Sequence, residues 1–309
     1  MRSLVRFVSI MSISAFVLSA CGSGGDAAAT QTVKDAMVKS QEVKSGEYEY
    51  HIVADVVDSE LGGSFDVMVS GVVDSRDYEN LIFSMAVAGT VKDPGLGDQN
   101  FDLEVRVVEN IAYGIINESP AALALFMPDF EEQYGKKWFS FELPAEVVEQ
   151  FKTLDASVDD EVENLTPQEQ AIRDIILNAE YVESAKSEGS EDGMDKYSVD
   201  LDEDVIVDLM VQFSEIDGYT PDEKETESLE EIIDGMEVVV YVDPATGIAV
   251  GFEGEFVLEI DENDPSAGTV EFTFTAMMSN LGEDVELEAP SESEPFDIES
   301  LFGSSLMGL

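Results

Sequence analysis

The sequence predicts an α+β protein built on a large curved antiparallel sheet, a half-barrel with helices covering its concave face. Three observations support this fold class. Apolar and polar residues alternate through much of the first 120 residues, helical spacing dominates the middle of the chain, and alternation returns near the C-terminus. A sheet of about nine or ten strands twists and tends to curl, so the helices in the middle of the chain would have a hollow side to cover.

The chain begins with the pattern of a secretory signal peptide. Arg2 and Arg6 precede an uncharged, mostly apolar run over residues 7–17, which is shorter than the ~20 residues that a membrane span requires. Leu-Ser-Ala-Cys at residues 18–21 then resembles the lipobox of bacterial lipoproteins. The resemblance implies that residues 1–20 are removed and that Cys21 carries a diacylglyceryl anchor. The alternative is a soluble secreted protein with an incidental cysteine.

The sequence divides the mature chain into three parts. Residues 21–31 are expected to form a flexible tether, residues 32–290 one half-barrel domain, and residues 291–309 an acidic mobile tail. A helix is expected from Thr32 to about Val43. A strand follows, because Tyr48, Tyr50 and Ile52 alternate with polar neighbours. Further strands are expected at about 64–73, 79–89, 100–108 and 111–116, separated by short turns as in a meander.

The middle of the chain changes from strand to helix signals. A short apolar helix is expected over 119–133, stopped near Pro128, followed by a strand in KKWFSFEL, residues 136–143. Capping boxes at Thr166 and Thr220 each predict a helix start. Between them, residues 194–201 read as a strand and residues 202–216 as an amphipathic helix.

The C-terminal part returns to strands. Residues 236–243 and 248–260 flank the turn DPATG, residues 269–278 form a further strand, and VELEAP, residues 285–290, is expected to end the sheet. Gly254 falls on the apolar face of its strand, which indicates a bend or a close backbone approach.

The order of these features is similar to one family. A lipobox, an N-terminal helix, SGEYEY, KKWFSF, a helical insert, VDPATG and VELEAP follow one another along the chain. In this layout residues 32–290 resemble the LppX/LprG-type lipoproteins, which share the LolA/LolB-like half-barrel. The resemblance implies a curved sheet whose hollow side often holds lipid acyl chains in that family. The strong acidity of this chain departs from the family pattern.

The amino-acid composition limits the kinds of partner that the chain can bind. With 68 acidic and 15 basic residues, the formal net charge is −53, so nucleic acid is excluded as a partner and close approach to an anionic membrane surface is disfavoured. The carboxylates have two explanations, a solvated surface suited to a salty environment or calcium binding. No stretch fits the EF-hand pattern: Val199 stands where the bidentate Glu should be, and Pro265 breaks the spacing of the other candidate.

Catalytic signatures are missing from the sequence. No Gly-x-Ser-x-Gly elbow and no Gly-rich phosphate loop occur. The single histidine, His51, falls on the polar face of its strand, and Trp138 is either a ligand platform or a core or strand-edge anchor. We therefore expect no enzyme activity, no cofactor and no metal.

Two functions remain open. The first is an anchored envelope lipoprotein, monomeric and facing outside the cytoplasmic membrane, that binds or carries a lipid or another hydrophobic ligand. The candidate pocket residues are large apolar side chains at expected inward positions: Phe83, Met85, Leu125, Phe126, Met127, Met210, Phe213, Phe272 and Phe274. A filled core would explain the same residues. The second function is a non-catalytic interaction or sensor lipoprotein with an acidic surface and no lipid cargo.

Overall fold

The structure is a computed structural model. It describes residues 26–57, 62–77, 80–123, 130–143, 167–216, 219–221, 226, 230, 233, 235–260 and 268–296. The expected signal peptide, Cys21, residues 124–129 and most of the helix expected from Thr220 to Asp234 lie outside these residues.

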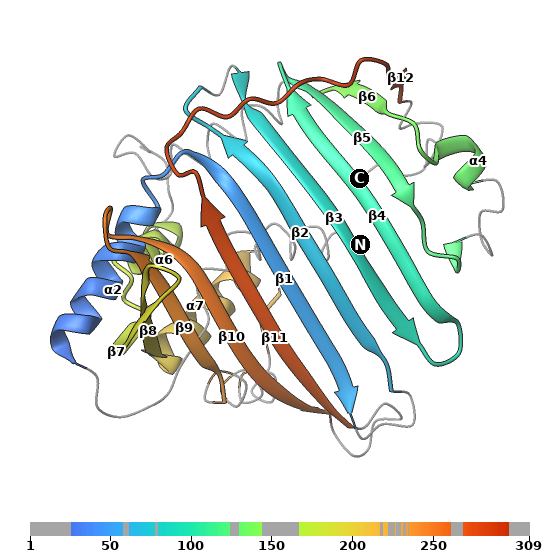
Figure 1. Cartoon of the computed structure of the whole chain (residues 1–309). Coiled ribbons are helices and arrows are strands. Elements are labelled where there is room, and N and C mark those ends of the chain that lie inside the picture. Colours follow the sequence, from blue (N-terminus) through green and yellow to red (C-terminus); the bar gives the residue numbers. More distant parts are fainter. Residues whose placement is uncertain are drawn as a thin grey trace.

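The described residues form one open, half-barrel-like sheet of twelve strands (Figure 1). The strands are β1 Ser45–Val57, β2 Ser64–Asp74, β3 Ile82–Asp93, β4 Gly97–Val108, β5 Ile111–Glu118, β6 Phe139–Glu142, β7 Val182–Glu191, β8 Met194–Leu201, β9 Glu237–Asp243, β10 Ile248–Ile260, β11 Gly268–Ser279 and β12 Glu294–Pro295. Their order is β12-β6-β5-β4-β3-β2-β1-β11-β10-β9-β8-β7. Neighbouring strands are antiparallel except β12, which pairs with β6 in parallel.

Two meanders make up this sheet. Strands β1–β6 form the first and β7–β11 the second, and they join where β1 pairs with β11. Two-residue turns link some of the strands: Glu109 and Asn110 both have positive φ between β4 and β5, as do Asp192 and Gly193 between β7 and β8. Such turns match the twist of antiparallel strands. The predicted fold class is therefore confirmed.

Strand β7 was not predicted from the sequence. Its residues, VESAKSEGSE, bury only Val182 and Ala185, and the other side chains are partly or fully exposed. Strand β7 lies at the edge of the sheet. It therefore lacks the alternation of apolar and polar residues that identifies a strand with one buried face. The Asp192-Gly193 turn was the signal that could have located it.

The helices with given bounds are α2 Ala27–Ser40, α4 Phe130–Tyr134, α6 Pro167–Leu177 and α7 Glu203–Ile216. Helix α2 begins at Ala27 rather than Thr32, because the Asp26 side chain accepts a hydrogen bond from the Ala28 amide and caps the helix. Residues 27–31, expected in the tether, are therefore helical. Residues 124–129 are not described, and α4 begins after the predicted stop at Pro128.

Helices α2, α6 and α7 gather at the β7–β10 end of the sheet (Figure 1). The buried core lies there, with Val33 from α2, Ile206 from α7, Tyr181 beside β7 and Val240 from β9 all 0–1% exposed. As predicted for α7, Ile206 and Leu209 are buried, while Met210 is half-buried against the core.

A C-terminal strap, residues 281–296, crosses the ends of the strands from β11 to β12 (Figure 1). VELEAP lies in this strap and forms no strand, which corrects its expected role in the sheet. The Gly282 amide donates to the Ser45 carbonyl at 2.8 Å, and Arg106 Nη1 donates to the Glu288 carbonyl at 3.1 Å. Residues 291–296 belong to the tail expected to be mobile, yet Glu294 and Pro295 pair with β6.

Candidate functional site

One face of the sheet is apolar across nearly its whole width. Directly opposite residues on neighbouring strands point to the same side, and one such row crosses nine strands without a polar side chain, apart from two tyrosines. The row is Tyr197, Val240, Phe252, Ala276, Tyr50, Val69, Val87, Leu103 and Ile116. We call this side the apolar face.

The burial of this row changes along its length. From β8 to β11 its four residues are 9% exposed or less, beneath the helices of the core. From β1 to β5 its members are only half-buried. Farther along the same face, Phe65 of β2 is 37% exposed. The apolar face therefore continues beyond the closed core as a partly accessible hydrophobic surface.

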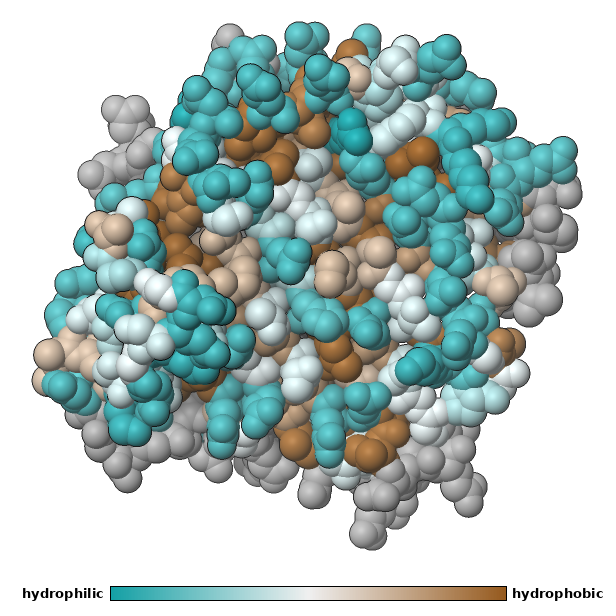
Figure 2. Space-filling model, viewed as in Figure 1, coloured by the Kyte–Doolittle hydropathy of each residue, from teal (hydrophilic) through white to brown (hydrophobic). Residues whose placement is uncertain are grey.

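The opposite face of the first meander mixes polar side chains with apolar ones, among them the exposed Val57 and Met68. There His51 Nε2 lies 2.9 Å from Asp66 Oδ1, and both side chains are exposed. Figure 2 views the sheet from the side crossed by the strap, where hydrophilic residues are spread over the surface. Within the described residues, no group of three or more His, Cys, Asp or Glu side chains is placed to hold a metal ion.

The structure places six of the nine candidate pocket residues. Phe83 and Met85 lie on β3 and Phe272 and Phe274 on β11, all on the apolar face and separated by strands β1 and β2. Met210 and Phe213 lie on α7 and are half-buried. Leu125, Phe126 and Met127 lie outside the described residues. The four candidates on the sheet therefore share a face without forming one cluster.

Aromatic contacts hold the apolar face together. The Phe256 and Phe272 rings stack 4.6 Å apart, almost parallel. Tyr48 and Phe83 rings lie 6.5 Å apart, and the Tyr48 hydroxyl donates to the Ser84 carbonyl at 2.7 Å. Burial raises the pKa of Tyr48, and the neighbouring Tyr50 raises it further. Tyr48 is therefore a neutral donor at physiological pH.

The sequence analysis did not identify most of the glycines on the apolar face as site residues. A Cβ on Gly71 would lie 2.6 Å from the Tyr48 hydroxyl, and one on Gly89 would lie 2.8 Å from the Phe101 ring. Gly254 was expected to mark a bend or a close backbone approach, but the structure shows a close side-chain approach instead, because a Cβ there would meet the Phe274 ring. Each glycine leaves room for an aromatic side chain of a neighbouring strand.

Trp138 lies directly before β6. The Arg106 guanidinium stacks over the Trp138 ring, 4.8 Å from the ring centroid. The Trp138 carbonyl accepts a hydrogen bond from the Glu294 amide at 2.8 Å. These contacts fit the interpretation of Trp138 as a strand-edge anchor rather than as a ligand platform.

A cavity of about 560 Å³ lies at the rim of the sheet rather than on the apolar face. It is lined by residues from the end of α2, the start of β1 and the beginning of the strap, and none of the nine candidates lines it.

The helices among the described residues include none long and apolar enough to cross a membrane.

No family model and no curated protein matches the sequence. Among solved structures, the chain is similar to LprF from Mycobacterium bovis, at 13% identity over 86% of this chain and 98% of LprF, with a TM-score of 0.37. A DUF1329 family protein from Desulfovibrio piger matches at 12% identity over 84% of this chain and 95% of its own, with a TM-score of 0.22. With TM-scores this low, we argue function from the chain's own residues.

Proposed function

We propose that the chain is an envelope lipoprotein, anchored through Cys21, that binds the acyl chains of a lipid on the apolar face of its sheet without catalysis. The observation that carries this proposal is the apolar row described above. Its residues are sealed beneath helices over β8–β11 but only half-buried over β1–β5. Half-buried apolar surface on this scale is what a hydrophobic ligand would cover.

The dimensions of the surface suit an acyl chain. Strands lie about 4.8 Å apart, so the row from Tyr50 on β1 to Ile116 on β5 spans roughly 19 Å. One leaflet of a bilayer, half of its ~30 Å hydrocarbon core, is shorter than that. Each methylene buried against the row contributes roughly 0.8 kcal/mol, so binding needs few polar contacts.

Uptake of a fluorescent, uncharged acyl probe tests the proposal. In the variant Met85→Gln with Val87→Thr, polar atoms replace apolar ones on the half-buried part of the face, and we expect about tenfold weaker binding. Met68→Gln is the matched control, because Met68 lies on the neighbouring strand, faces the opposite side and is 44% exposed. Equal probe binding by the double variant and the wild type would contradict the proposal.

The anchor is tested separately. Cys21→Ser removes the sulfur that would carry the diacylglyceryl group, so the protein should leave the membrane fraction. A Cys21→Ser protein that still sediments with membranes and resists carbonate extraction would show that the anchor lies elsewhere. Probe binding is expected to be unchanged in this variant.

A further inference from the structure

Exposed apolar side chains gather at one end of the sheet. At this end β1 and β10 finish and β2 and β11 begin, so that Val57 pairs with Thr269 at the start of β11. Among the described residues six large apolar side chains are exposed, and two of them, Met68 and Tyr219, lie elsewhere on β2 and after α7. The other four are Val57, Phe65, Leu96 in the β3–β4 turn and Val257, which are 37–56% exposed. We call this end the apolar end, and Figure 2 shows hydrophobic residues there, at the bottom of the view.

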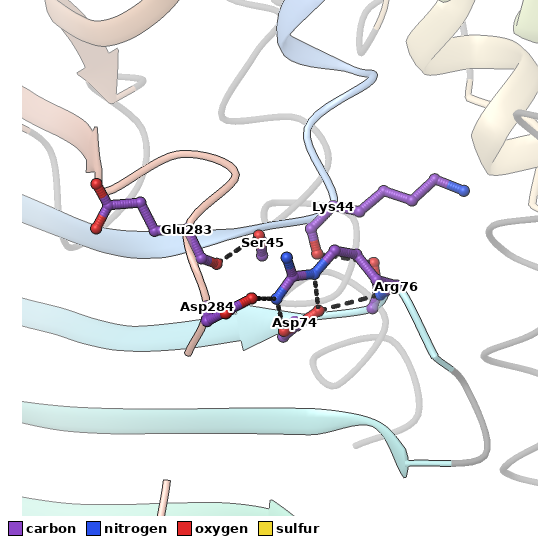
Figure 3. Close-up of polar contacts among 7 residues, drawn as sticks. Lys44, Ser45, Asp74, Arg76, Glu283 and Asp284 are labelled. Carbon is purple, nitrogen blue, oxygen red and sulfur yellow. Dashed lines mark hydrogen bonds and ion pairs between the residues drawn. The ribbon is translucent and has the colours of Figure 1, made fainter. Parts of the chain in front are cut away.

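The opposite end of the sheet, which we call the strap end, is held by polar contacts (Figure 3). There β1 begins and β2 ends. Arg76 Nε donates to Asp74 Oδ1 at 2.9 Å, and Arg76 Nη2 lies 3.0 Å from Asp284 Oδ1 on the strap. The Ser45 hydroxyl donates to the Glu283 carbonyl at 2.9 Å. These contacts fasten the strap across the strand ends, so the polar groups of this end are already engaged within the chain.

Helix α2 begins at the apolar end. The Asp26 amide donates to the Ala185 carbonyl, near the start of β7, at 3.0 Å. Strands β1, β11, β10, β9, β8 and β7 are neighbours in this order, and each is antiparallel to the next, so β7 begins at the end of the sheet where β1 finishes. Figure 1 shows α2 running from this end toward the start of β1. The first described residue, Asp26, therefore lies at the same end of the sheet as the exposed apolar side chains.

The distance along the chain from Asp26 to Cys21 is short. Five residues of extended chain span at most about 18 Å, so the anchor proposed for Cys21 would hold the start of α2 close to a bilayer surface. Phe65 belongs to both surfaces, because it lies on the apolar face and at the apolar end. The surface proposed to bind acyl chains therefore continues to the end of the sheet from which the anchor leaves.

We propose that the apolar end docks on the surface of a zwitterionic bilayer, with its exposed side chains in the boundary between head groups and acyl chains. Apolar side chains of membrane-surface segments lie about 5–10 Å deep in this layer. Asp55, Asp93 and Asp98 lie at the same end and outnumber the exposed Lys92, so a surface of anionic lipids would repel it. This inference rests on the proposed anchor and adds the orientation of the sheet on the membrane.

Quenching of tryptophan fluorescence by brominated phosphatidylcholine tests this orientation in the full chain anchored to vesicles. Trp138 is the single tryptophan and stacks with Arg106, near the strap end of β4. Leu96→Trp adds an indole at the apolar end, and Glu286→Trp is the control, because Glu286 is an exposed residue of the strap. We expect the added tryptophan of Leu96→Trp to be quenched, and the fluorescence of wild type and Glu286→Trp to stay unchanged.

The anchor does not limit this test. The chain has a single cysteine, so a Cys21 that carries no lipid can be coupled through its thiol to a maleimide-bearing phospholipid. The orientation is then measured whether or not the natural anchor exists. A failure of the anchor is thereby distinguished from a failure of the docking surface.

Substitutions at the apolar end test whether its side chains cause the docking. In Leu96→Trp, the further changes Val57→Asp and Val257→Asp should reduce quenching at least about fivefold, because charged groups resist transfer into the bilayer. Met68→Asp is the matched control, since Met68 is exposed on the same side of the sheet but pairs with His51 nearer the middle of β1. It should leave quenching unchanged, and a thermal melt verifies that each variant is folded.

The lipid composition provides the last arm. Brominated phosphatidylglycerol in place of phosphatidylcholine should weaken the quenching of Leu96→Trp at low salt, and added salt should restore it. Absence of quenching in Leu96→Trp, equal quenching in Glu286→Trp or equal loss in Met68→Asp overturns the docking surface. Stronger quenching by phosphatidylglycerol overturns the assignment to a zwitterionic surface.

Discussion

Gly71 is the residue that allows Tyr48 to reach across strand β2. A Cβ at Gly71 would lie 1.9 Å from the Ser84 carbonyl oxygen and 2.6 Å from the Tyr48 hydroxyl. The first of these atoms is backbone and cannot rotate away. The Tyr48–Ser84 hydrogen bond, and the contact of Tyr48 with the Phe83 ring, both depend on this missing side chain.

Gly71→Ala should therefore lower the free energy of unfolding by about 1–3 kcal/mol, as overpacked sites do. Gly114→Ala is the control, because Gly114 is also a strand glycine on the apolar face and its Cβ would meet only one atom, at 4.0 Å. Gly114→Ala should leave the free energy of unfolding unchanged or raise it slightly. Urea denaturation compares the two, and a Gly71→Ala protein as stable as Gly114→Ala would show that the strand shifts freely.

Buried tyrosines predict a loss of stability in alkali. Burial raises the pKa values of Tyr48, Tyr50 and Tyr181 above their ordinary value of 10.0. In the unfolded chain these groups lose their protons near pH 10, while the folded protein keeps them, so their contribution is complete below about pH 10 and is lost as the pH rises further.

Denaturation midpoints of wild type and Tyr48→Phe, measured from neutral pH upward, test this effect. At neutral pH the variant should be about 0.5–1.5 kcal/mol less stable, because the hydrogen bond to Ser84 is gone. Above about pH 10 the difference should shrink or reverse. If the denaturation midpoints of the two proteins change with pH in parallel, deprotonation of the Tyr48 hydroxyl does not contribute to the loss of stability in alkali.

At the residue level, the sequence predicted which side chains face which side of the sheet. Alternation alone assigned Tyr50, Phe83 and Phe274 to the apolar face, whereas at Gly254 the group that approaches is the Phe274 side chain and not the expected backbone. Gly71 was not predicted as a site residue. Its partner Tyr48 belongs to another strand, and periodicity within one strand carries no information about neighbours across the fold.

At the scale of elements, helix α2 is fastened to the sheet at its first residue. Asp26 caps the helix through its side chain, and its own amide donates to the Ala185 carbonyl of β7 at 3.0 Å. The Thr30 hydroxyl accepts from the Ala185 amide at 2.9 Å. The helix start was placed too late from the sequence because Ala27–Thr30 look like linker, and only the cap residue marks the boundary.

Asp26→Ala should cost about 1 kcal/mol of stability through loss of the cap. Asp35→Ala on the same helix is the matched control: its carboxylate accepts only an exposed hydrogen bond from Gln31, so the cost should be about 0.2–0.5 kcal/mol. Urea denaturation measures both. Equal losses would mean that the Asp26 side chain does not cap the helix in solution.

At the scale of the whole molecule, charge repulsion opposes the folded state. The 68 acidic residues outnumber the 15 basic ones and repel one another, and described ion pairs such as Lys186–Glu188 and Arg76–Asp284 are largely exposed. Salt screens such repulsion, with a Debye length near 10 Å at 0.1 M and about 3 Å at 1 M.

The melting temperature should therefore rise from low to molar sodium chloride, by about 2–4 °C for each kcal/mol of repulsion removed. A flat or falling melting temperature would contradict this expectation. Calcium added at constant ionic strength is the control, and a separate increase on its addition would indicate specific cation sites.

The pairing of β1 with β11 also sets an order of events while the chain is being synthesised. The residues that leave the ribosome first can complete the β1–β6 meander from local hairpins, which close at little entropic cost. Strand β1 must then wait with one bare edge until residues 268–279 emerge, because Ala54 pairs with Phe272 and Tyr50 with Ala276. The unpaired strand β1 carries three acidic side chains, Glu47, Glu49 and Asp55. Their charges disfavour pairing of another chain with the edge of β1 that β11 later covers.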